Sequence, residues 1–360
     1  MALQSLLVQN LRNIQSLELS LADDVNLFFG ANGAGKTSIL EAIDFLSRGR
    51  SFRHHRLNPL LRKDAETITV SSTVQHGEQK LRMGIEKSSQ HTTLHQNQQK
   101  VASISAHAMY LPVVSMHPDS HQLIQGGAKY RRNFIDWTAF HVKHDFLQDW
   151  RDFNKCLRQR NQMLRSGKTA SKELLAWTEE LCLQANKVNE ARSAIFNELM
   201  PIFLDFIDKI LPEAEIELDY YAGWPKELTL ASAIEQTQQQ EQVKRTTQRG
   251  PHRADIKIQL NQQTASAAAS RGQQKLIAAC LLLAQIKFAQ ANSKQRCIVL
   301  LDDIRAELDQ PHTNALLAEL QALKCQAFIT AIEEKQINLT GWKEAKTFHV
   351  KQGTCEAGCD

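Results

Sequence analysis

Gly30-Ala31-Asn32-Gly33-Ala34-Gly35-Lys36-Thr37 is the most informative run in this 360-residue sequence. It fits the pattern G-x-x-x-x-G-K-[ST], and it lies between a compact apolar strand predicted at 26–29 and an amphipathic helix predicted directly after it. Glycine lets backbone N–H groups turn inward around an anion, and a helix N-terminus adds partial positive charge. The run therefore predicts a loop that binds nucleotide phosphates, and the flanking strand and helix argue against a chance glycine-rich turn.

Two side chains at the end of this loop carry the expected chemistry. Lys36 is predicted to neutralise the β- and γ-phosphate oxygens of ATP, which makes it a candidate catalytic residue. The hydroxyl of Thr37 is predicted to bind Mg²⁺. We expect the whole stretch from Gly30 through Ser38 to contact ATP, with Mg²⁺ as the second cofactor.

A second apolar strand, predicted at 297–301, ends in the carboxylate pair Asp302-Asp303. Asp302 is predicted to hold Mg²⁺ through water, and Asp303 is predicted to act as the general base that polarises the attacking water. The alternative is a charged strand end that caps the next helix. The glycine loop earlier in the chain favours the catalytic interpretation.

Ser270-Arg271-Gly272-Gln273 precedes a long apolar helix predicted at 273–288. The Ser270 hydroxyl, the Gly272 N–H and Gln273 would form an anion site at the helix N-terminus. Taken alone, a serine helix cap explains these residues equally well. Together with the loop, the Asp pair and Ala306-Glu307-Leu308-Asp309, they resemble the ordered motifs of ABC-type ATPases. That resemblance implies a head-to-tail homodimer in which the signature of one protomer completes the ATP site of the other.

The periodicity of the chain predicts an α/β fold interrupted by helices. Residues 1–125 and 245–360 are expected to form an ABC-type ATPase head with a mixed β-sheet, and 126–244 a mostly helical lobe with a basic face. Further strands are predicted at 6–8, 16–21, 67–74, 81–85, 108–111 and 327–330, and a helix at 311–323. The glutamine-rich stretch 234–243 is expected to be an exposed helix or linker.

Composition bounds the remaining possibilities. The net charge of +4 does not by itself indicate a nucleic-acid partner, and the seven cysteines include no C-x-x-C pair, so no zinc or thioredoxin-like site is indicated. The longest apolar stretch, Ala278–Ile286, is too short to cross a bilayer of ~30 Å. With no signal peptide at the start, we expect a cytoplasmic protein without a membrane association.

Several long stretches resemble the RecF family of bacterial recombination-mediator ATPases along nearly the whole chain. The resemblance rests on Leu11-Arg12-Asn13, Leu111-Pro112, Pro118-Asp119, Tyr130–Trp137, Gln159-Arg160-Asn161 and Gly250–Asp255, together with Ser270–Lys275 and Asp302–Asp309. It implies that Arg12 and Asn13 lie by the nucleotide. It also implies binding to gapped, double-stranded and single-stranded DNA, and assistance in loading RecA with RecR and RecO during repair and the SOS response.

Two positions depart from the wider ABC pattern. Asp303 stands where many ABC ATPases carry Glu, a replacement that resembles the RecF family and implies slow turnover. Thr330 stands where transporters carry a histidine that senses the γ-phosphate, so a sensor role for Thr330 does not follow.

The candidate DNA surface comes from charge distribution. Residues 129–168 hold ten Lys or Arg and four Asp, a net of +6, which exceeds the charge of the whole chain. Arg151, Lys155, Arg158 and Arg165 fall on one predicted helical face and suit contact with DNA phosphates. The alternatives are a solvated helix face and, for some of these cations, internal pairing, as of Arg131 and Arg132 with Asp136. At the level of function, the rival is a nucleotide-gated protein-recruitment switch with little DNA affinity.

Overall fold

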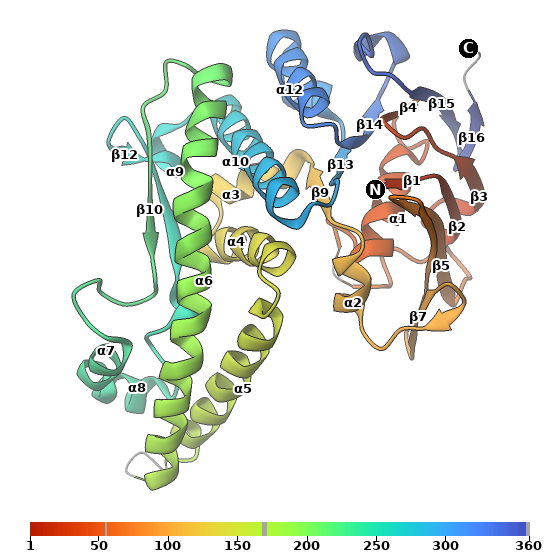
Figure 1. The fold of residues 1–360 in the computed structure, drawn as a ribbon. Helices are drawn as coiled ribbons and strands as arrows, with labels where there is room; N and C mark the ends of the chain where they lie inside the picture. The colour runs from red at the N-terminus through yellow and green to blue at the C-terminus, as the bar shows by residue number, and fades with distance from the viewer. Residues whose placement is uncertain (55, 168–170, 358–360) are drawn as a thin grey trace. The chain divides into compact units, whose positions relative to one another are not determined.

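The computed structural model describes residues 1–54, 56–167 and 171–357, so Lys168 of the basic segment and Cys359 lie outside the described residues. The chain divides into two compact units (Figure 1). Unit 1 comprises 1–120 and 281–360, and unit 2 comprises 121–280.

A six-stranded sheet with the order β16-β15-β4-β14-β13-β9 forms the centre of unit 1. Its strands are β4 (Val25–Phe29), β9 (Val113–Met116), β13 (Ile298–Leu301), β14 (Gln326–Ala331), β15 (Ala345–Lys351) and β16 (Thr354–Ala357). All neighbours pair in parallel except β15 and β16. β13 and β14 are buried along their whole length, as expected for central parallel strands covered on both faces.

A second sheet of unit 1 is antiparallel and runs β3-β2-β5-β6-β7-β8, with β1 paired to β5. It contains β1 (Ala2–Leu3), β2 (Ser5–Leu11), β3 (Ile14–Ser20), β5 (Thr67–His76), β6 (Gln79–Ser88), β7 (Thr92–Gln96) and β8 (Gln99–Lys100). Helix α1 (Lys36–Arg48) belongs to the same hydrophobic core, in which Ile39, Leu40 and Phe45 are fully or almost fully buried. The core therefore fixes the helix that follows the phosphate loop.

The strand predicted at 108–111 is wrong. Ala108 and Met109 end helix α2 (Ile104–Met109), and Tyr110 and Leu111 follow it outside any strand. The N-terminus of α2 is capped by the Ser103 hydroxyl, which accepts from the Ala106 N–H. The strand begins after Pro112, at the β-branched pair Val113-Val114. The serine cap at Ser103 is the sequence signal that marks Ile104–Met109 as helix.

The remaining helices of unit 1 follow the carboxylate strand. They are α11 (Ile304–Glu307) and α12 (Gln310–Ala322), whose N-terminus is capped by the Asp309 side chain. The predicted helix at 311–323 and strand at 327–330 are confirmed to within a residue or two.

Unit 2 is mostly helical, as predicted. It contains α3 (Gln122–Gln125), α4 (Ala128–Val142), α5 (Phe146–Arg165), α6 (Lys172–Ile210), α7 (Leu230–Gln236), α8 (Gln238–Lys244) and α9 (Ala265–Ala268), and a sheet of β10 (Ile216–Tyr221), β11 (Asp255–Leu260) and β12 (Gln263–Thr264). α5 and the 39-residue α6 lie side by side (Figure 1). The glutamine-rich stretch forms α7 and α8, and its Glu241 is buried, so the expectation of a merely exposed segment is wrong there.

The division between the units differs from the predicted boundary after 244. Residues 245–280 belong to unit 2 because β11 pairs along its full length with β10, from Ile216 opposite Leu260 to Tyr221 opposite Asp255. The division falls within α10 (Arg271–Ser293), after Cys280.

Helix α10 is longer than the apolar stretch recognised in the sequence. Among the described residues, α10 is the one helix that is long and apolar enough to cross a membrane, and 72% of its most apolar window is buried inside the protein. A mostly buried helix in the core of a protein has the same length and composition.

Candidate functional site

The loop at 30–37 joins β4 to α1 in a conformation that depends on two glycines. Gly30 has φ 147°, and a Cβ there would overlap the carbonyl oxygen of Val350 on β15. Gly35 has φ 115°, and a Cβ there would lie 2.9 Å from Nδ2 of Asn13. α1 begins at Gly35 without a side-chain cap, so its first N–H groups remain available to an anion.

Asn13 braces the loop from the turn between β2 and β3. Its Nδ2 donates to the Ala34 carbonyl at 3.0 Å, and its Oδ1 accepts from the Ser38 hydroxyl at 3.2 Å. The Gly353 N–H also donates to the Ala34 carbonyl, at 2.7 Å. The loop is thus held in shape by two distant segments of the chain.

Lys36 lies across the loop. Its Nζ donates to the carbonyl oxygens of Gly30 at 2.7 Å and Ala31 at 3.0 Å. Burial lowers the pKa of Lys36, and the nearby charges of Asp303 and Asp302 act in the opposite direction. The ammonium group, the predicted metal ligand Asp302 and the predicted general base Asp303 therefore share one electrostatic environment.

A chain of hydrogen bonds connects the loop helix to the Asp pair. The Thr37 hydroxyl donates to Oδ1 of Asp302 at 2.8 Å, and the Thr330 hydroxyl donates to the same oxygen at 3.0 Å. The Asp303 N–H donates to the Thr330 hydroxyl at 2.7 Å. This geometry follows from strand order, because β14 lies between β4 and β13 and brings Thr330 between the two motifs.

The carboxylates of Asp302 and Asp303 differ in burial and in hydrogen bonding. Asp302 is buried, and burial raises its pKa above the usual value while the hydrogen bonds from Thr37 and Thr330 oppose that shift. Asp303 has φ 54°, a left-handed conformation that is uncommon for a residue other than glycine. Its side chain does not cap α11, and it accepts no hydrogen bond from the described residues. The helix-cap alternative for Asp303 is therefore not what the structure has.

The oxygen atoms of Thr37 and Asp302 fit Mg²⁺, which prefers hard oxygen ligands and takes the rest of its coordination from phosphates and water. Across the described ranges, no group of three or more His, Cys, Asp or Glu side chains is arranged to hold a metal. A hydroxyl and one carboxylate are few ligands for a dedicated protein site, but they are the number that a metal carried by a nucleotide needs.

The Arg12 side chain pairs with a carboxylate of the helix that follows the loop. Its guanidinium forms a two-pronged ion pair with Glu41 of α1, a carboxylate that is fully buried and also accepts from the Ser51 hydroxyl at 2.6 Å. Arg12 thus fastens the β2–β3 turn to the loop helix. This pairing was not foreseen from the sequence, since nothing local marks Glu41 as buried.

The signature residues lie at the start of α10, in unit 2. The Ser270 hydroxyl accepts from the Gln273 N–H at 3.2 Å, and the Ser270 N–H donates to the Gln273 side chain at 2.9 Å. This reciprocal pattern is a capping box, so the helix-cap alternative is realised. Gly272 is exposed at the same helix start. A cap of this kind holds the first turn of a helix in place and leaves that turn open to solvent.

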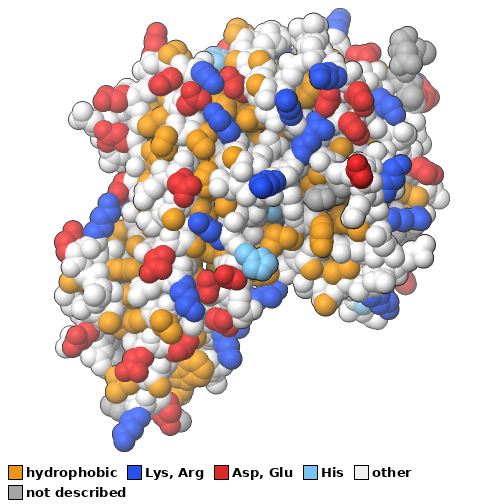
Figure 2. Space-filling model, viewed as in Figure 1, with side chains coloured by type: hydrophobic (Ala, Val, Ile, Leu, Met, Phe, Trp, Pro, Cys, Tyr) orange, Lys and Arg blue, Asp and Glu red, His pale blue; other side chains and the backbone are white. Residues whose placement is uncertain are grey.

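The predicted DNA residues lie on the outer side of α5. Arg151, Lys155, Arg158 and Arg165 are all exposed, whereas Phe153, Cys156, Arg160 and Leu164 of the same helix are buried. Figure 2 shows Lys and Arg side chains interspersed with Asp and Glu over the helices of unit 2 on the face in view.

Two other cations of residues 129–168, Arg131 and Arg132, form contacts inside the protein. Arg131 forms an ion pair with Asp255 at 2.7 Å, and Arg132 donates to the Ala254 carbonyl at 2.8 Å. Asp136, the predicted partner of both, pairs instead with the buried Arg192 at 2.7 Å. Arg131 and Arg132 thus form internal contacts, as the alternative interpretation predicts, but Asp136 is the wrong partner. A distant helix, α6, supplies the cation that pairs with Asp136.

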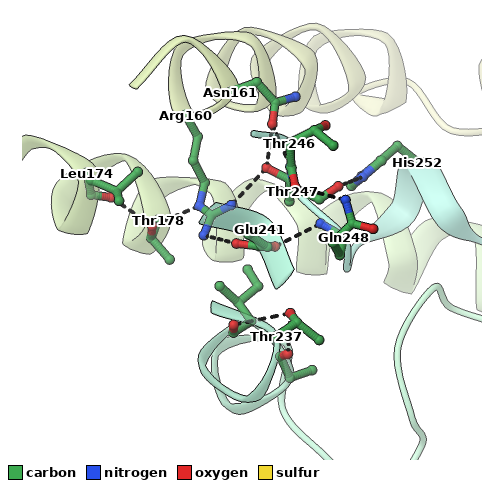
Figure 3. Close-up of polar contacts among 12 residues, drawn as sticks. Arg160, Asn161, Leu174, Thr178, Thr237, Glu241, Thr246, Thr247, Gln248 and His252 are labelled. Atoms are coloured by element: carbon green, nitrogen blue, oxygen red, sulfur yellow. Dashed lines mark hydrogen bonds and ion pairs between the residues drawn. The ribbon is translucent and has the colours of Figure 1, made fainter. Parts of the chain in front are cut away.

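Arg160 is the centre of a buried network in unit 2 (Figure 3). It forms an ion pair with Glu241 of α8 at 2.6 Å and donates to the hydroxyls of Thr247 at 2.8 Å and Thr178 at 2.9 Å. Asn161 accepts from both the N–H and the hydroxyl of Thr247. The Gln159–Asn161 motif therefore ties the glutamine-rich segment to α5 and α6.

Comparison with known proteins finds a matching family model and relatives that cover nearly the whole chain. The protein-family model described as RecF/RecN/SMC N terminal domain matches residues 2–356. The DNA replication and repair protein RecF of Pseudomonas entomophila (strain L48) is 36% identical over 358 residues, which cover 98% of this chain and 97% of that protein. RecF of Pseudomonas syringae pv. tomato (strain ATCC BAA-871 / DC3000) is also 36% identical, over 359 residues that cover 98% of this chain and 97% of that protein.

Solved structures with a similar fold include a relative with ATP. A structure of the recombination mediator protein RecF with ATP, in the RecFOR pathway, has a TM-score of 0.88 and 25% identity, covering 99% of this chain and 98% of that chain. An Smc head bound to the C-winged helix domain of ScpA has a TM-score of 0.61 at 14% identity, covering 99% and 97% of the two chains, and shares the fold alone.

Proposed function

Because the chain belongs to the RecF family of DNA replication and repair proteins, we propose that it is an ATP-driven DNA-binding dimer that acts as a recombination mediator. The observation that carries the proposal is the bond from Thr37 to Asp302, which brings the loop motif and the carboxylate motif together across 265 residues of sequence. A phosphate loop, a metal-binding hydroxyl and a carboxylate pair are the parts that ATP hydrolysis needs.

Each residue has a proposed part. The stretch from Gly30 to Ser38 holds the phosphates, with Lys36 against the β/γ oxygens, and Asn13 keeps the loop in shape. Thr37 and Asp302 hold Mg²⁺, and Asp303 orients the attacking water. The γ-phosphate of the same ATP binds Ser270, Gly272 and Gln273 of a second protomer, so that two ATP molecules join a homodimer. Arg12 supports the site indirectly, because its ion pair with Glu41 fastens to α1 the turn that carries Asn13.

Slow turnover is part of the proposal. Asp is one methylene shorter than Glu, so at position 303 it reaches less far toward a water at the γ-phosphate. Thr330 holds the backbone N–H of Asp303 and the carboxylate of Asp302, which assigns it to positioning the pair instead of sensing the γ-phosphate. A long-lived ATP dimer suits a protein that marks a DNA structure until others arrive.

The DNA surface is proposed to be the exposed cationic face of α5, formed by Arg151, Lys155, Arg158 and Arg165. Contacts of this kind read phosphates and not sequence. The proposed ligands are gapped, double-stranded and single-stranded DNA, and the proposed partners are RecR, RecO and RecA in the cytoplasm, in support of RecA loading and the SOS response.

The test is binding to a gapped duplex with and without ATP across a salt series. Tight, ATP-dependent and salt-sensitive binding is expected, because an ATP dimer doubles the cationic surface. If the ATP dimer forms and yet no DNA binds at low salt, the rival function, a nucleotide-gated switch that recruits proteins, replaces the DNA-binding proposal.

A further inference from the structure

A cavity of about 580 Å³ lies at the amino ends of the parallel strands in unit 1. Asp24 directly precedes β4, Arg296 lies just before β13, and Trp342-Lys343 lie just before β15. The phosphate loop follows the other end of β4, which at ~3.4 Å per residue is roughly 17 Å away. The cavity is therefore separate from the ATP site.

Part of the cavity wall is fixed by hydrogen bonds. Arg296 forms an ion pair with Asp24 at 2.6 Å and donates to the Cys325 carbonyl at 3.1 Å. Gln290 donates to the Leu323 carbonyl at 2.8 Å and accepts from the Cys297 N–H at 2.8 Å. Among the described residues that line the cavity, the one carboxylate, that of Asp24, is thus already neutralised by an arginine.

Three lysines from three different segments surround this wall. Lys294 follows α10, Lys324 lies two residues after α12, and Lys343 lies in the turn before β15. All three are exposed, and none forms an ion pair with a residue of the described chain. A cation after a helix end is stabilised by the helix dipole, which accounts for Lys294 and Lys324. It does not account for Lys343, and the cavity is left with an excess of three positive charges.

An aromatic ring and amide groups complete the lining. Trp342 is half-buried at the cavity, next to Gly341, whose φ is 89°. A Cβ at Gly341 would lie 2.7 Å from Nε2 of Gln321, so glycine lets this amide approach the tryptophan turn. Gln295 also lines the cavity. Amide groups of this kind are suited to the polar edges of a nucleobase.

We propose that this cavity binds a nucleotide, with its base against Trp342 and its phosphate among Lys294, Lys324 and Lys343. Its volume lies within the ~300–1,000 Å³ of typical ligand sites. Stacking of a base on an aromatic ring beside cationic side chains is the common chemistry of single-strand binding. The nucleotide is either free or one unit of single-stranded DNA, and only the second source rests on the proposed function.

The experiment is photocrosslinking of the full-length protein, with saturating Mg·ATP to fill the phosphate loop. One arm uses an oligo(dT) that contains 5-bromodeoxyuridine, and the other uses 5-bromodeoxyuridine monophosphate. Peptide mapping is expected to find the crosslink at Trp342. A crosslink from both probes indicates a nucleotide site open to either source, and one from the oligonucleotide alone assigns single-stranded DNA.

Charge variants keep the test independent of folding. Replacing Lys294, Lys324 and Lys343 together by Gln is expected to lower the crosslink yield at Trp342 at least about fivefold, because the phosphate loses its cations. The matched control replaces three exposed lysines elsewhere in unit 1, namely Lys63, Lys80 and Lys100, and is expected to leave the yield unchanged. In an anisotropy titration, Trp342→Leu is expected to weaken oligonucleotide binding about fivefold or more.

Three results would overturn the proposal. One is the lack of any crosslink at Trp342 from either probe. The other is an equal loss of yield in the control triple variant, which would mean that general charge and not the cavity retains the strand. Binding of a glutamate-rich peptide at Trp342 in place of both probes would also exclude a nucleotide site. ATP-driven dimerisation of the same variants, measured in parallel, tells a failure of this site from a failure of the ATP site.

Discussion

At the scale of residues, a single hydroxyl of Thr330 contacts both members of the Asp pair, because it donates to Asp302 and accepts from the Asp303 N–H. We predict that Thr330→Val slows single-turnover ATP hydrolysis roughly tenfold, which corresponds to about 1.4 kcal/mol, while ATP binding is retained. Thr330→Ser keeps the hydroxyl and should restore the rate. Equal rates in the valine and serine variants would remove the positioning role.

Asp302 gives a prediction with a defined sign. Burial raises the pKa of this carboxyl in the folded state, so the folded protein binds more protons than the unfolded chain at pH values between the two pKa values. Its ionised form therefore costs stability at neutral pH, and stability is regained as pH falls through the folded pKa.

Asp302→Asn still accepts from Thr37 and Thr330 but carries no charge. We expect it to raise Tm by roughly a few degrees at pH 7, with a gain that shrinks as pH falls, and to abolish Mg²⁺-dependent hydrolysis. Calorimetry across pH 4–8 measures the first effect. A lower Tm at pH 7 would mean that the charge stabilises the apoprotein.

At the scale of elements, α5 has an exposed cationic side and a buried side. Its outer side presents the proposed DNA residues, and its inner side buries Arg160 in the ion pair with Glu241. We predict that Arg151→Glu with Lys155→Glu weakens DNA binding about tenfold and lowers the log–log salt slope by about 2. Lys80→Glu with Lys100→Glu in unit 1 is the matched control. A similar loss in both would leave only net charge as the cause.

The inner side of α5 is expected to matter for stability. Removing one partner of a buried pair leaves an uncompensated charge, so Arg160→Ala should lower the free energy of unfolding by about 3–5 kcal/mol. The double variant Arg160→Met with Glu241→Leu should recover much of that loss, because neither charge remains. Denaturant unfolding of both variants checks this, and additive losses would show that the two residues are not coupled.

The same element shows what could be predicted from sequence. Helical periodicity located α5 and its exposed cations, because both are local patterns. The pattern could not tell that Arg160 faces inward, since its partners Glu241 and Thr247 come from segments about eighty residues away. Likewise the local sequence predicts Arg131 or Arg132 as the partner of Asp136, whereas its partner is Arg192 of α6. When two charged residues that pair are far apart in the sequence, no local sequence pattern indicates the pairing.

At the scale of the whole molecule, the predicted ABC-type ATPase fold is confirmed, because its motifs are contiguous runs that determine where strands end. The boundary of the helical unit was harder to predict. β10 and β11 are separated by α7 and α8, and only their pairing assigns residues 245–280 to unit 2. The shared ATP site between two protomers remains a proposal at this scale.

The shared ATP site is tested by the mass of Asp303→Asn with saturating Mg·ATP, measured by sedimentation. This variant keeps the loop, Thr37 and Asp302 but lacks the proposed general base, so ATP should persist and hold two protomers together. A site shared between two protomers predicts a dimer with ATP, a monomer without it, and a monomer in the double variant with Lys36→Ala. A monomer of Asp303→Asn at saturating ATP would contradict the shared site.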